Sequence, residues 1–411
     1  MAGPAGNPEI QLEHQGRTAD RYAGRPRPHW LRIVGKLAIP AVILAAAWFV
    51  GVVVDQHWAE LARLGLGFAF VVYLAVVARG RYRDAAAIVA SVLLCLVALD
   101  AYHLMTSSWV IETRTPGYQV ARAILGWGPE HPGVFNQTKR DGKTGRVIID
   151  ADYTIDAHLA RKVISAEAGP TVAFFGDSWT FGHGLPDALT LPQLYADTTE
   201  RRLRVLNLAF NGYGPQQLLR PLEVGMYDDL LKQLRVVVFQ TSPSDAERSS
   251  CARDFMMRAP RYVLIDGQPS FQGTCAERSH GALRWLYSTT SFYYSFVEPL
   301  LSRANQADLD LYVGIIIRAG QLAREKYGAA TAILFIPADA SYMQHAGYTN
   351  EQIVQRLRDA GLLVIDGTLD PGKFAGQDLR IPGDGHPTGV ANRARAAILA
   401  DALADLVAQP R

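Results

Sequence analysis

Residues 171–186 read TVAFFGDSWTFGHGLP, a mostly apolar run that stops at Gly176-Asp177-Ser178. Further apolar runs follow along the chain, and amphipathic stretches such as residues 191–203 and 350–361 separate them. These runs cover residues 204–210, 235–241, 330–337 and 362–368. Short, continuous apolar strands that alternate with helices are typical of a parallel sheet covered by helices on both faces. The sequence therefore predicts an α/β fold for this part of the chain.

Ser178 lies just after the first of these predicted strands. Sites in open α/β sheets form beyond the carboxyl ends of the strands. A serine at that place can present its hydroxyl in a crevice, while N–H groups of the turn face a carbonyl oxygen. A simpler interpretation is also open at this point, in which Asp177 and Ser178 cap the helix that follows.

Two other stretches carry residue types that a serine nucleophile needs. Residues 205–219, VLNLAFNGYGPQQLL, contain Gly212 and Gly214, where the backbone can approach a ligand and donate an N–H to an oxyanion. Residues 381–399, IPGDGHPTGVANRARAAIL, place Asp384 and His386 two positions apart before the last expected helix. A serine hydroxyl needs a base, and an imidazole held by a carboxylate is the usual one.

These three stretches resemble the sequence blocks of the SGNH, or GDSL-type, hydrolase superfamily over roughly residues 165–408. The resemblance implies a flavodoxin-like parallel sheet with helices on both faces. It implies Ser178 as nucleophile, His386 as base and Asp384 as the group that orients His386. The oxyanion hole would use the backbone N–H groups of Ser178 and Gly212. Substrates in this superfamily are varied esters of glycosides, lipids and polysaccharides.

The sequence departs from the family pattern in two places. The acid normally lies three residues before the histidine, but position 383 is Gly, so Asp384 is the local candidate. The third block normally supplies an asparagine to the oxyanion hole, and the corresponding stretch FQTSPSDAERSS has none. Ser244 is the candidate replacement, unless the two N–H groups suffice. Asp245 would repel an oxyanion unless its side chain is turned away.

Three apolar stretches near the N-terminus predict membrane-spanning helices. They cover residues 37–54, 64–78 and 85–99, and the last two are shorter than the usual span of about 20 residues. Snorkelling and interfacial anchoring by Arg63, Arg79, Trp58 and Tyr82 can extend them. Basic residues gather before the first stretch and between the second and third, which predicts a cytoplasmic N-terminus and export of the chain beyond about residue 100. No convincing cleavage site follows the first stretch, so we expect an uncleaved anchor.

These observations divide the chain into four expected parts. Residues 1–36 form a basic cytoplasmic segment, and residues 37–105 form three transmembrane helices in the inner membrane. Residues 106–164 form an exported linker or small β region, with a strand pair around residues 147–155. Residues 165–411 form the α/β catalytic domain on the periplasmic side.

The cysteines agree with export. Cys251 and Cys275 lie in a segment that resembles a surface excursion, and two cysteines in an oxidising compartment tend to form a disulfide. Cys95 lies inside the third apolar stretch, where we expect inert packing.

Composition and motifs leave three functions open. A net charge of +2 gives no support to nucleic-acid binding, and the sequence shows no pattern that requires a metal or a cofactor.

The first function is a membrane-anchored esterase that acts on an acylated carbohydrate or lipid through an acyl-Ser178 intermediate. The second is an O-acyltransferase that passes the acyl group to a polysaccharide, and the third is an inert carbohydrate-binding relative. Partners in polysaccharide synthesis stay unknown.

Aromatic residues and a further histidine surround the expected nucleophile. Three aromatic residues flank the proposed site residues: Trp179, Phe181 and Tyr213. Their rings are compatible both with stacking on a sugar and with packing in the core. His183 lies in the same loop, but nothing in the sequence marks it as a base. The aromatic run at residues 285–301 is expected to form a helix on the sheet or at the membrane surface.

Overall fold

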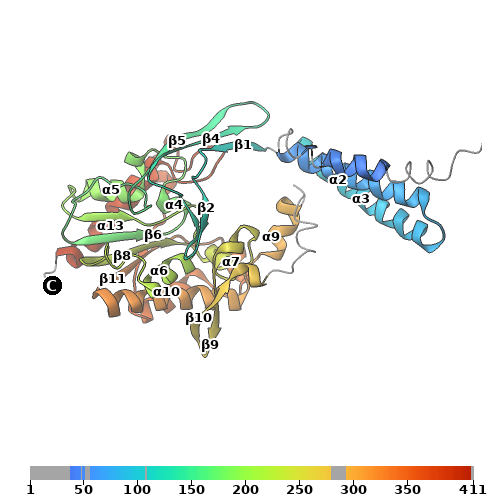
Figure 1. Ribbon diagram of the computed structural model, residues 1–411. Helices are drawn as coiled ribbons and strands as arrows, with labels where there is room; N and C mark the ends of the chain where they lie inside the picture. Colours follow the sequence, from blue (N-terminus) through green and yellow to red (C-terminus); the bar gives the residue numbers. More distant parts are fainter. Residues whose placement is uncertain (1–37, 48, 51–55, 107–108, 279–292, 409–411) are drawn as a thin grey trace, which may run out of the picture. The chain divides into compact units, whose positions relative to one another are not determined.

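The computed structural model describes the chain except for residues 1–37, 48, 51–55, 107–108, 279–292 and 409–411 (Figure 1). The chain divides into two compact units, Met1–Ala101 and Tyr102–Arg411.

The N-terminal unit is built from apolar helices. α2 (Gln56–Val77) and α3 (Arg81–Thr106) are 22 and 26 residues long. Their apolar windows, Trp58–Val77 and Arg81–Thr106, have mean hydropathies of 1.8 and 2.2 and are long enough to cross a membrane. Both helices are longer than the stretches predicted from their apolar residues, because the helices include the charged and aromatic flanks.

The first predicted span is described only in part. Ala38–Ala47 is a shorter apolar helix, and part of the predicted stretch 37–54 lies outside the described residues. The three crossings and their orientation therefore stay predictions. Cys95, which we expected to be packed, is an exposed free cysteine on α3.

The second unit contains a five-stranded parallel sheet in the order β12-β11-β8-β6-β7. Numbered along the chain, these strands have the order 2-1-3-4-5, which is the flavodoxin-like arrangement. The predicted fold class is therefore confirmed. The strands are β6 (Thr171–Phe175), β7 (Arg204–Asn207), β8 (Leu234–Thr241), β11 (Ala330–Phe335) and β12 (Leu363–Asp366).

Strand β7 is shorter than predicted. It ends at Asn207 rather than continuing to residue 210. The Asn207 side chain accepts from the backbone N–H of Ala209 and donates to the carbonyls of Thr180 and Phe181. These hydrogen bonds tie the end of β7 to the residues that follow β6 and β7.

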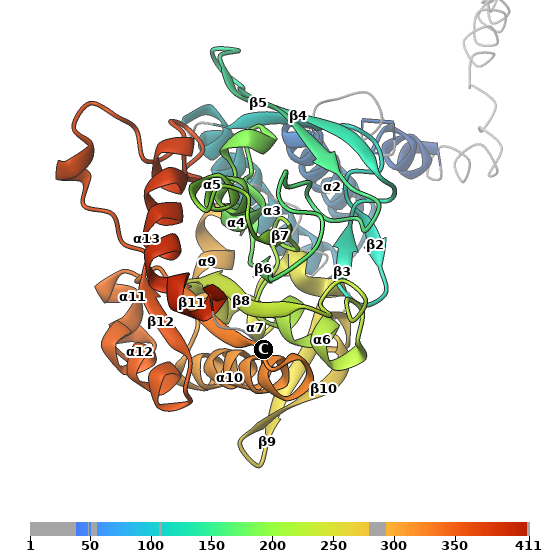
Figure 2. The same ribbon diagram turned by 90° about the vertical axis from the view of Figure 1, so that its left-hand side faces the viewer.

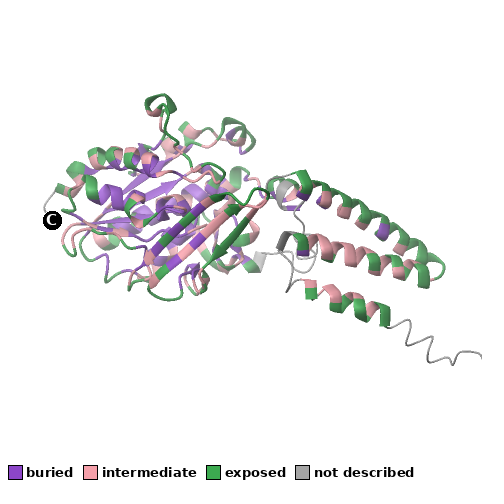
Figure 3. Ribbon diagram, turned by 90° about the horizontal axis from the view of Figure 1, so that it is seen from above, coloured by how far each residue is buried: buried purple, intermediate pink, exposed green. Residues whose placement is uncertain are grey.

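Helices cover both faces of the sheet (Figure 2). Successive side chains of a strand point to opposite faces. Val172 and Phe174 of β6 pack in one buried cluster with α5 (Leu191–Thr198) and α13 (Gly389–Ala408). Ala173 and Phe175 pack in another with α6 (Gln216–Val224), α10 (Gln306–Tyr327) and α12 (Asn350–Asp359). Figure 3 shows the strands between these helices as the buried core.

A three-stranded antiparallel sheet precedes the parallel one and has the order β1-β4-β5. Its strands are β1 (Val110–Arg114), β4 (Gly133–Asp141) and β5 (Val147–Ile155), which confirms the strand pair expected near residues 147–155. A small hairpin joins β2 (Val120–Arg122) to β3 (Gly126–Gly128). Phe135 and Tyr153 from this region share a buried cluster with Phe181 and Phe210, which follow β6 and β7. The region therefore packs against the loops at the carboxyl ends of the parallel strands.

The segment between Cys251 and Cys275 contains a hairpin, and a disulfide closes it. β9 (Pro260–Ile265) pairs with β10 (Gln268–Thr274). Cys251 and Cys275 are bonded, with 5.4 Å between their Cα atoms, and both are buried. The predicted disulfide is therefore confirmed.

Several short helices complete the unit. Residues 285–292 of the predicted aromatic helix lie outside the described part, and Tyr293–Val297 and Glu298–Leu301 (α9) are helical. The other short helices are α4 (Ser178–Phe181), α7 (Ala246–Ser249) and α11 (Ala340–His345).

Candidate active site

A sharp turn after β6 presents Ser178. Gly176 has a φ of +150°, and a Cβ added there would lie 2.3 Å from Thr180 Oγ1, so a larger residue does not fit. Asp177 is the N-cap of α4, and its side chain accepts from the Trp179 N–H at 2.9 Å. Ser178 is the first residue of that helix. The capping interpretation thus holds for Asp177, and the Ser178 hydroxyl is left for another contact.

Arg161 holds the loop that follows Ser178. Its guanidinium is buried and donates to the carbonyls of Phe181, Gly182 and Leu185 at 2.8 to 3.1 Å. An ion pair with Asp187 at 2.9 Å completes its contacts with the loop. Burial lowers the pKa of Arg161, although the charge of Asp187 opposes this. These bonds fix the backbone that carries the candidate nucleophile.

The structure brings Ser178, His386 and Asp384 together. His386 Nε2 lies 2.8 Å from Ser178 Oγ, and His386 Nδ1 bonds to Asp384 Oδ1. A neutral imidazole that donates from Nδ1 to the carboxylate keeps the lone pair of Nε2 for the serine proton. The two-residue spacing suffices for this contact, since the backbone N–H of His386 also donates to Asp384 Oδ1. Such an arrangement allows the imidazole to take the serine proton while the carboxylate orients the ring.

Asp384 is held by a residue that the sequence did not mark. The Nζ of Lys139, on β4, lies 2.6 Å from Asp384 Oδ2. The Asp384 side chain is 1% exposed and that of Lys139 is 18% exposed. Burial raises the pKa of Asp384, but hydrogen bonds from His386 and Lys139 outweigh it, so the pKa is lowered overall. Asp384 therefore stays ionised beside His386.

His183 lies against the same group. Its ring centroid is 4.3 Å from that of His386, and its Nε2 is 3.9 Å from Asp384 Oδ2. The other ring nitrogen lies 3.0 Å from Asn211 Nδ2. Burial, followed by the charge of His386, lowers the pKa of His183 to about 4. His183 is consequently neutral at pH 7 and packs beside the base, a position that the sequence did not reveal.

The atoms of this cluster are engaged in hydrogen bonds. His183, Asp384 and His386 offer ligand atoms within 4.8 Å of one another, which is a spacing that can hold a metal ion. Lys139 and His386 contact the two oxygens of Asp384, and Nε2 of His386 faces Ser178. These contacts engage both oxygens of Asp384 and both ring nitrogens of His386.

The other two proposed oxyanion residues, Gly212 and Ser244, lie in turns. Gly212 has a φ of +77°, and a Cβ added there would lie 3.2 Å from Phe255 and 3.4 Å from Trp127. Ser244 lies on the turn after β8 and lines a cavity with Asp177 and Trp179. The oxyanion roles of Ser178, Gly212 and Ser244 stay predictions.

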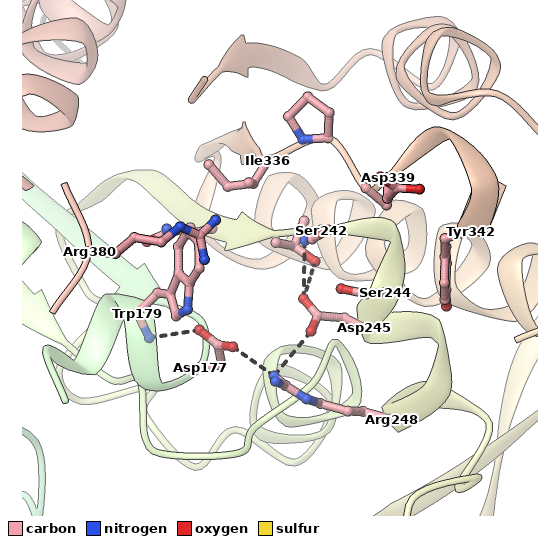
Figure 4. A pocket seen from close by; sticks show the side chains of 14 residues that line it. Asp177, Trp179, Ser242, Ser244, Asp245, Arg248, Ile336, Asp339, Tyr342 and Arg380 are labelled. Carbon is pink, nitrogen blue, oxygen red and sulfur yellow. Dashed lines mark hydrogen bonds and ion pairs between the residues drawn. The ribbon is translucent and has the colours of Figure 1, made fainter. Parts of the chain in front are cut away.

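Asp245 is engaged by neighbouring donors. Its Oδ2 accepts from Thr241 Oγ1 at 2.8 Å and from the Ser242 N–H at 3.2 Å. Its Oδ1 lies 3.1 Å from Nη1 of Arg248, and the same nitrogen lies 2.8 Å from Asp177 Oδ2. Figure 4 shows Arg248 between the two carboxylates. Burial opposes the charge of Arg248, but Asp245 and Asp177 outweigh it and raise the pKa of Arg248. Arg248 thus compensates part of the negative charge that Asp245 and Asp177 bring together.

A cavity lies beside the turn that carries Ser178. Ser178 itself is 9% exposed, and the residues on either side of it, Asp177 and Trp179, line a cavity of about 360 Å³ (Figure 4). Ser244, Tyr342 and Arg380 contribute to its wall. We call this space the first cavity. Its size suits a small acyl or sugar group.

Two of the three aromatic residues that flank the site residues in the sequence belong to the core. Phe181 and Tyr213 are buried in the cluster that they share with residues of the antiparallel sheet. Trp179 is half-buried and lines the first cavity, so its ring is placed to contact a ligand.

Comparisons with known proteins give structural neighbours. No family model and no curated protein matches the sequence. A solved structure from Veillonella parvula, a member of the lipolytic protein G-D-S-L family, is 15% identical, with a TM-score of 0.35 over 57% of this chain and 97% of that one. The psychrotrophic esterase EstA from Pseudoalteromonas sp. is 13% identical, with a TM-score of 0.34 over 58% of this chain and 99% of that one. A catalytic mutant of Axe2, an acetylxylan esterase from Geobacillus stearothermophilus, is 14% identical, with a TM-score of 0.30 over 60% and 98%. These neighbours are G-D-S-L proteins and esterases, whereas the function of this chain depends on its own side chains.

Proposed function

We propose that this chain is a serine esterase that forms an acyl-Ser178 intermediate. The observation that carries the proposal is the 2.8 Å contact between His386 Nε2 and Ser178 Oγ, with Asp384 bonded to Nδ1 of the same ring. A binding protein without catalysis would have no need of a base within hydrogen-bond distance of a serine. The arrangement therefore favours an enzyme over the inert alternative.

The proposed reaction has two acyl-transfer steps. Ser178 Oγ attacks the ester carbonyl, and its proton passes to His386 Nε2. The alcohol then leaves with that proton, and the acyl group stays on Ser178. Water attacks the acyl-serine, His386 takes a proton from it, and that proton returns to Ser178 as the acid departs. Asp384 stabilises the imidazolium in each step, and N–H groups of Ser178 and Gly212 would stabilise the oxyanion.

We propose an acylated carbohydrate as the substrate. The first cavity is lined by polar residues and the Trp179 ring, and the residues before and after Ser178 belong to its wall. A sugar hydroxyl in place of water would make the same residues an O-acyltransferase. Product analysis with an acylated donor and a sugar acceptor separates the two, because acylated acceptor accumulates only in the second case.

We further propose that the enzyme is anchored in the inner membrane with its catalytic unit in the periplasm. α2 and α3 are long and apolar enough to span a membrane, and exposed apolar side chains such as Val76 and Val92 suit a lipid-facing surface. A reporter that is active only outside the cytoplasm, fused after Arg411, should be active. Activity of a cytoplasm-specific reporter at the same site would contradict this.

The esterase is tested by hydrolysis of p-nitrophenyl acetate with the full-length protein in detergent. The wild type should release nitrophenol, and Ser178→Ala should reduce the rate to that of buffer. Ser270→Ala, on the distant hairpin strand β10, is the matched control and should keep the wild-type rate. Equal rates for Ser178→Ala and the wild type would contradict the proposal.

A further inference from the structure

A second cavity borders the residues that follow Ser178 and His386. It has a volume of about 530 Å³, and its lining includes Trp179 and Pro387, the immediate neighbours of the candidate nucleophile and base. Arg380 and Arg395 also line it. We call it the arginine cavity. It shares four lining residues with the first cavity: Trp179, Ile336, Pro337 and Arg380. The two cavities therefore adjoin at these residues, one of which, Trp179, directly follows Ser178.

The two arginines of this cavity have no carboxylate partner among the described residues. Arg395 is 7% exposed; its Nε donates to the Gly367 carbonyl at 3.0 Å, and its Nη1 is buried without a hydrogen-bond partner. Arg380 donates to the Gly385 carbonyl at 3.2 Å. Both guanidinium groups lie over the Trp179 ring, at 5.0 Å for Arg380 and 5.3 Å for Arg395. Asp378 supplies the acidic side chain of the lining, so the charged residues there sum to one positive charge.

The lack of a carboxylate partner within the described part of the chain distinguishes Arg395 from the buried Arg161 and the half-buried Arg248. Arg161 and Arg248 are each paired with a carboxylate within 3 Å. Burial lowers the pKa of Arg395 to about 10, and the charge of Arg380 acts in the same direction. A buried cation without an anion is unfavourable, and an aromatic ring compensates for it only in part. A bound anion would supply the missing charge, and the guanidinium fork suits carboxylate and phosphate oxygens alike.

We propose that the arginine cavity binds the anionic group, a carboxylate or a phosphate, of an acidic sugar unit in the ester substrate. The inference rests on the proposed function, because it assigns the substrate class of the same site. Trp179 would then lie between the reacting ester and the anionic group, since it lines both cavities and follows Ser178 directly. The enzyme would select esters of acidic glycans over esters of neutral ones.

Matched acetyl esters test this selection. The substrates are methyl glycosides of O-acetylated galactose, galacturonate and galactose 6-phosphate, with the acetyl group at the same position. The full-length wild type should show a kcat/KM at least about tenfold higher for one acidic ester than for the neutral ester, and rising salt should reduce that ratio. A preference for the uronate assigns a carboxylate, and a preference for the phosphate ester assigns a phosphate. Equal values for all three esters would overturn the inference.

Substitutions locate the preference. Arg380→Gln, at an exposed position, should lower the ratio of acidic to neutral kcat/KM by about five- to tenfold. Arg393→Gln, on the exposed side of the same helix as Arg395, is the matched control and should keep the wild-type ratio. An unchanged ratio in Arg380→Gln would overturn the inference.

Binding separates this inference from the esterase itself. Calorimetry of Ser178→Ala with trigalacturonate, and with phosphorylated and neutral trisaccharides, should show salt-sensitive affinity for an acidic ligand. Such binding together with no turnover of any ester would support the anion site and contradict the esterase. Turnover of all esters without a preference for acidic ones would support the esterase and contradict the anion site.

Discussion

Lys139 Nζ lies 2.6 Å from Asp384 Oδ2, although the two residues are 245 positions apart in the chain. The lysine belongs to strand β4 of the antiparallel sheet, and the aspartate belongs to the loop before α13. Lys139 thereby pairs with the acid that orients the candidate base. Strand β4 consequently supplies the positive charge that faces Asp384.

Replacing Lys139 by methionine tests its effect on the base. The carboxylate of Asp384 would then stabilise the imidazolium of His386 without a competing positive charge, so the acid limb of the kcat/KM profile should move to higher pH by about one unit. Lys139→Arg should restore the wild-type profile. Arg140→Met, at the neighbouring exposed position of β4, is the control. A profile that does not move in Lys139→Met, with stability alone reduced, would show that the lysine is only structural.

Ser244 tests the replacement of the missing asparagine. If its hydroxyl donates to the oxyanion, Ser244→Ala should lower kcat by about 10- to 10³-fold with little change in KM, because the donor acts in the transition state. Steady-state kinetics with p-nitrophenyl acetate measure both constants. A kcat equal to that of the wild type would show that Ser244 does not serve the oxyanion hole. The N–H groups of Ser178 and Gly212 would then be its remaining candidate donors.

His183 should make stability depend on pH. Its pKa in the folded protein is about 4, below the value of 6.5 for an unperturbed histidine, because burial disfavours the charged form. The unfolded state therefore binds the proton first as pH falls. The contribution of neutral His183 to the free energy of unfolding is complete above pH 6.5. It is lost as pH falls toward 4, which lowers the free energy of unfolding by up to about 3 kcal/mol.

Chemical denaturation at several pH values checks this expectation. His183→Gln should lose the part of the pH dependence between 6.5 and 4, whereas His158→Gln, at an exposed position, should keep it. Identical pH dependence in the wild type and His183→Gln would contradict the assignment.

The disulfide should contribute to the stability of the unit Tyr102–Arg411. Cys251 and Cys275 are separated by 24 positions, and opening a loop of that length should lower the free energy of unfolding by about 3 kcal/mol. The double variant Cys251→Ala, Cys275→Ala measures the loss, and Cys95→Ala is the control because that thiol is free. An unchanged free energy in the double variant, or two free thiols in exported, unreduced protein, would contradict the bond.

The sheet and the three candidate catalytic residues were predictable from local patterns. β6 is a short apolar run, and Gly176, Asp177 and Ser178 follow it directly. The position of the serine at the carboxyl end of this strand could therefore be predicted from the sequence. Asp384 and His386 lie two positions apart, and their contact needs only the local loop. The end of β7 could not be predicted in this way, because the residues after Asn207 are also apolar. The side chain of Asn207 forms its hydrogen bonds where the strand ends.

The supporting residues could not be predicted, because their partners lie far away in the sequence. Arg248 contacts Asp177 over 71 positions, and Lys139 contacts Asp384 over 245. Arg161 is a buried cation in a stretch with no distinctive pattern, and the carbonyls that it binds are 20 to 24 positions away. Lysine and arginine are usually exposed, so burial of these residues depends on the tertiary fold.

The covalent acyl-serine is the most direct test of the central claim. The full-length protein is mixed with p-nitrophenyl acetate, quenched in acid and digested, and the acetylated peptide is identified by mass spectrometry. We predict one acetyl group on the peptide that contains Ser178, none in Ser178→Ala, and formation slower by up to about 10⁴-fold in Asp384→Asn. An acetyl group on another residue, or equal labelling of Ser178→Ala and the wild type, would contradict the assignment of Ser178 as the nucleophile.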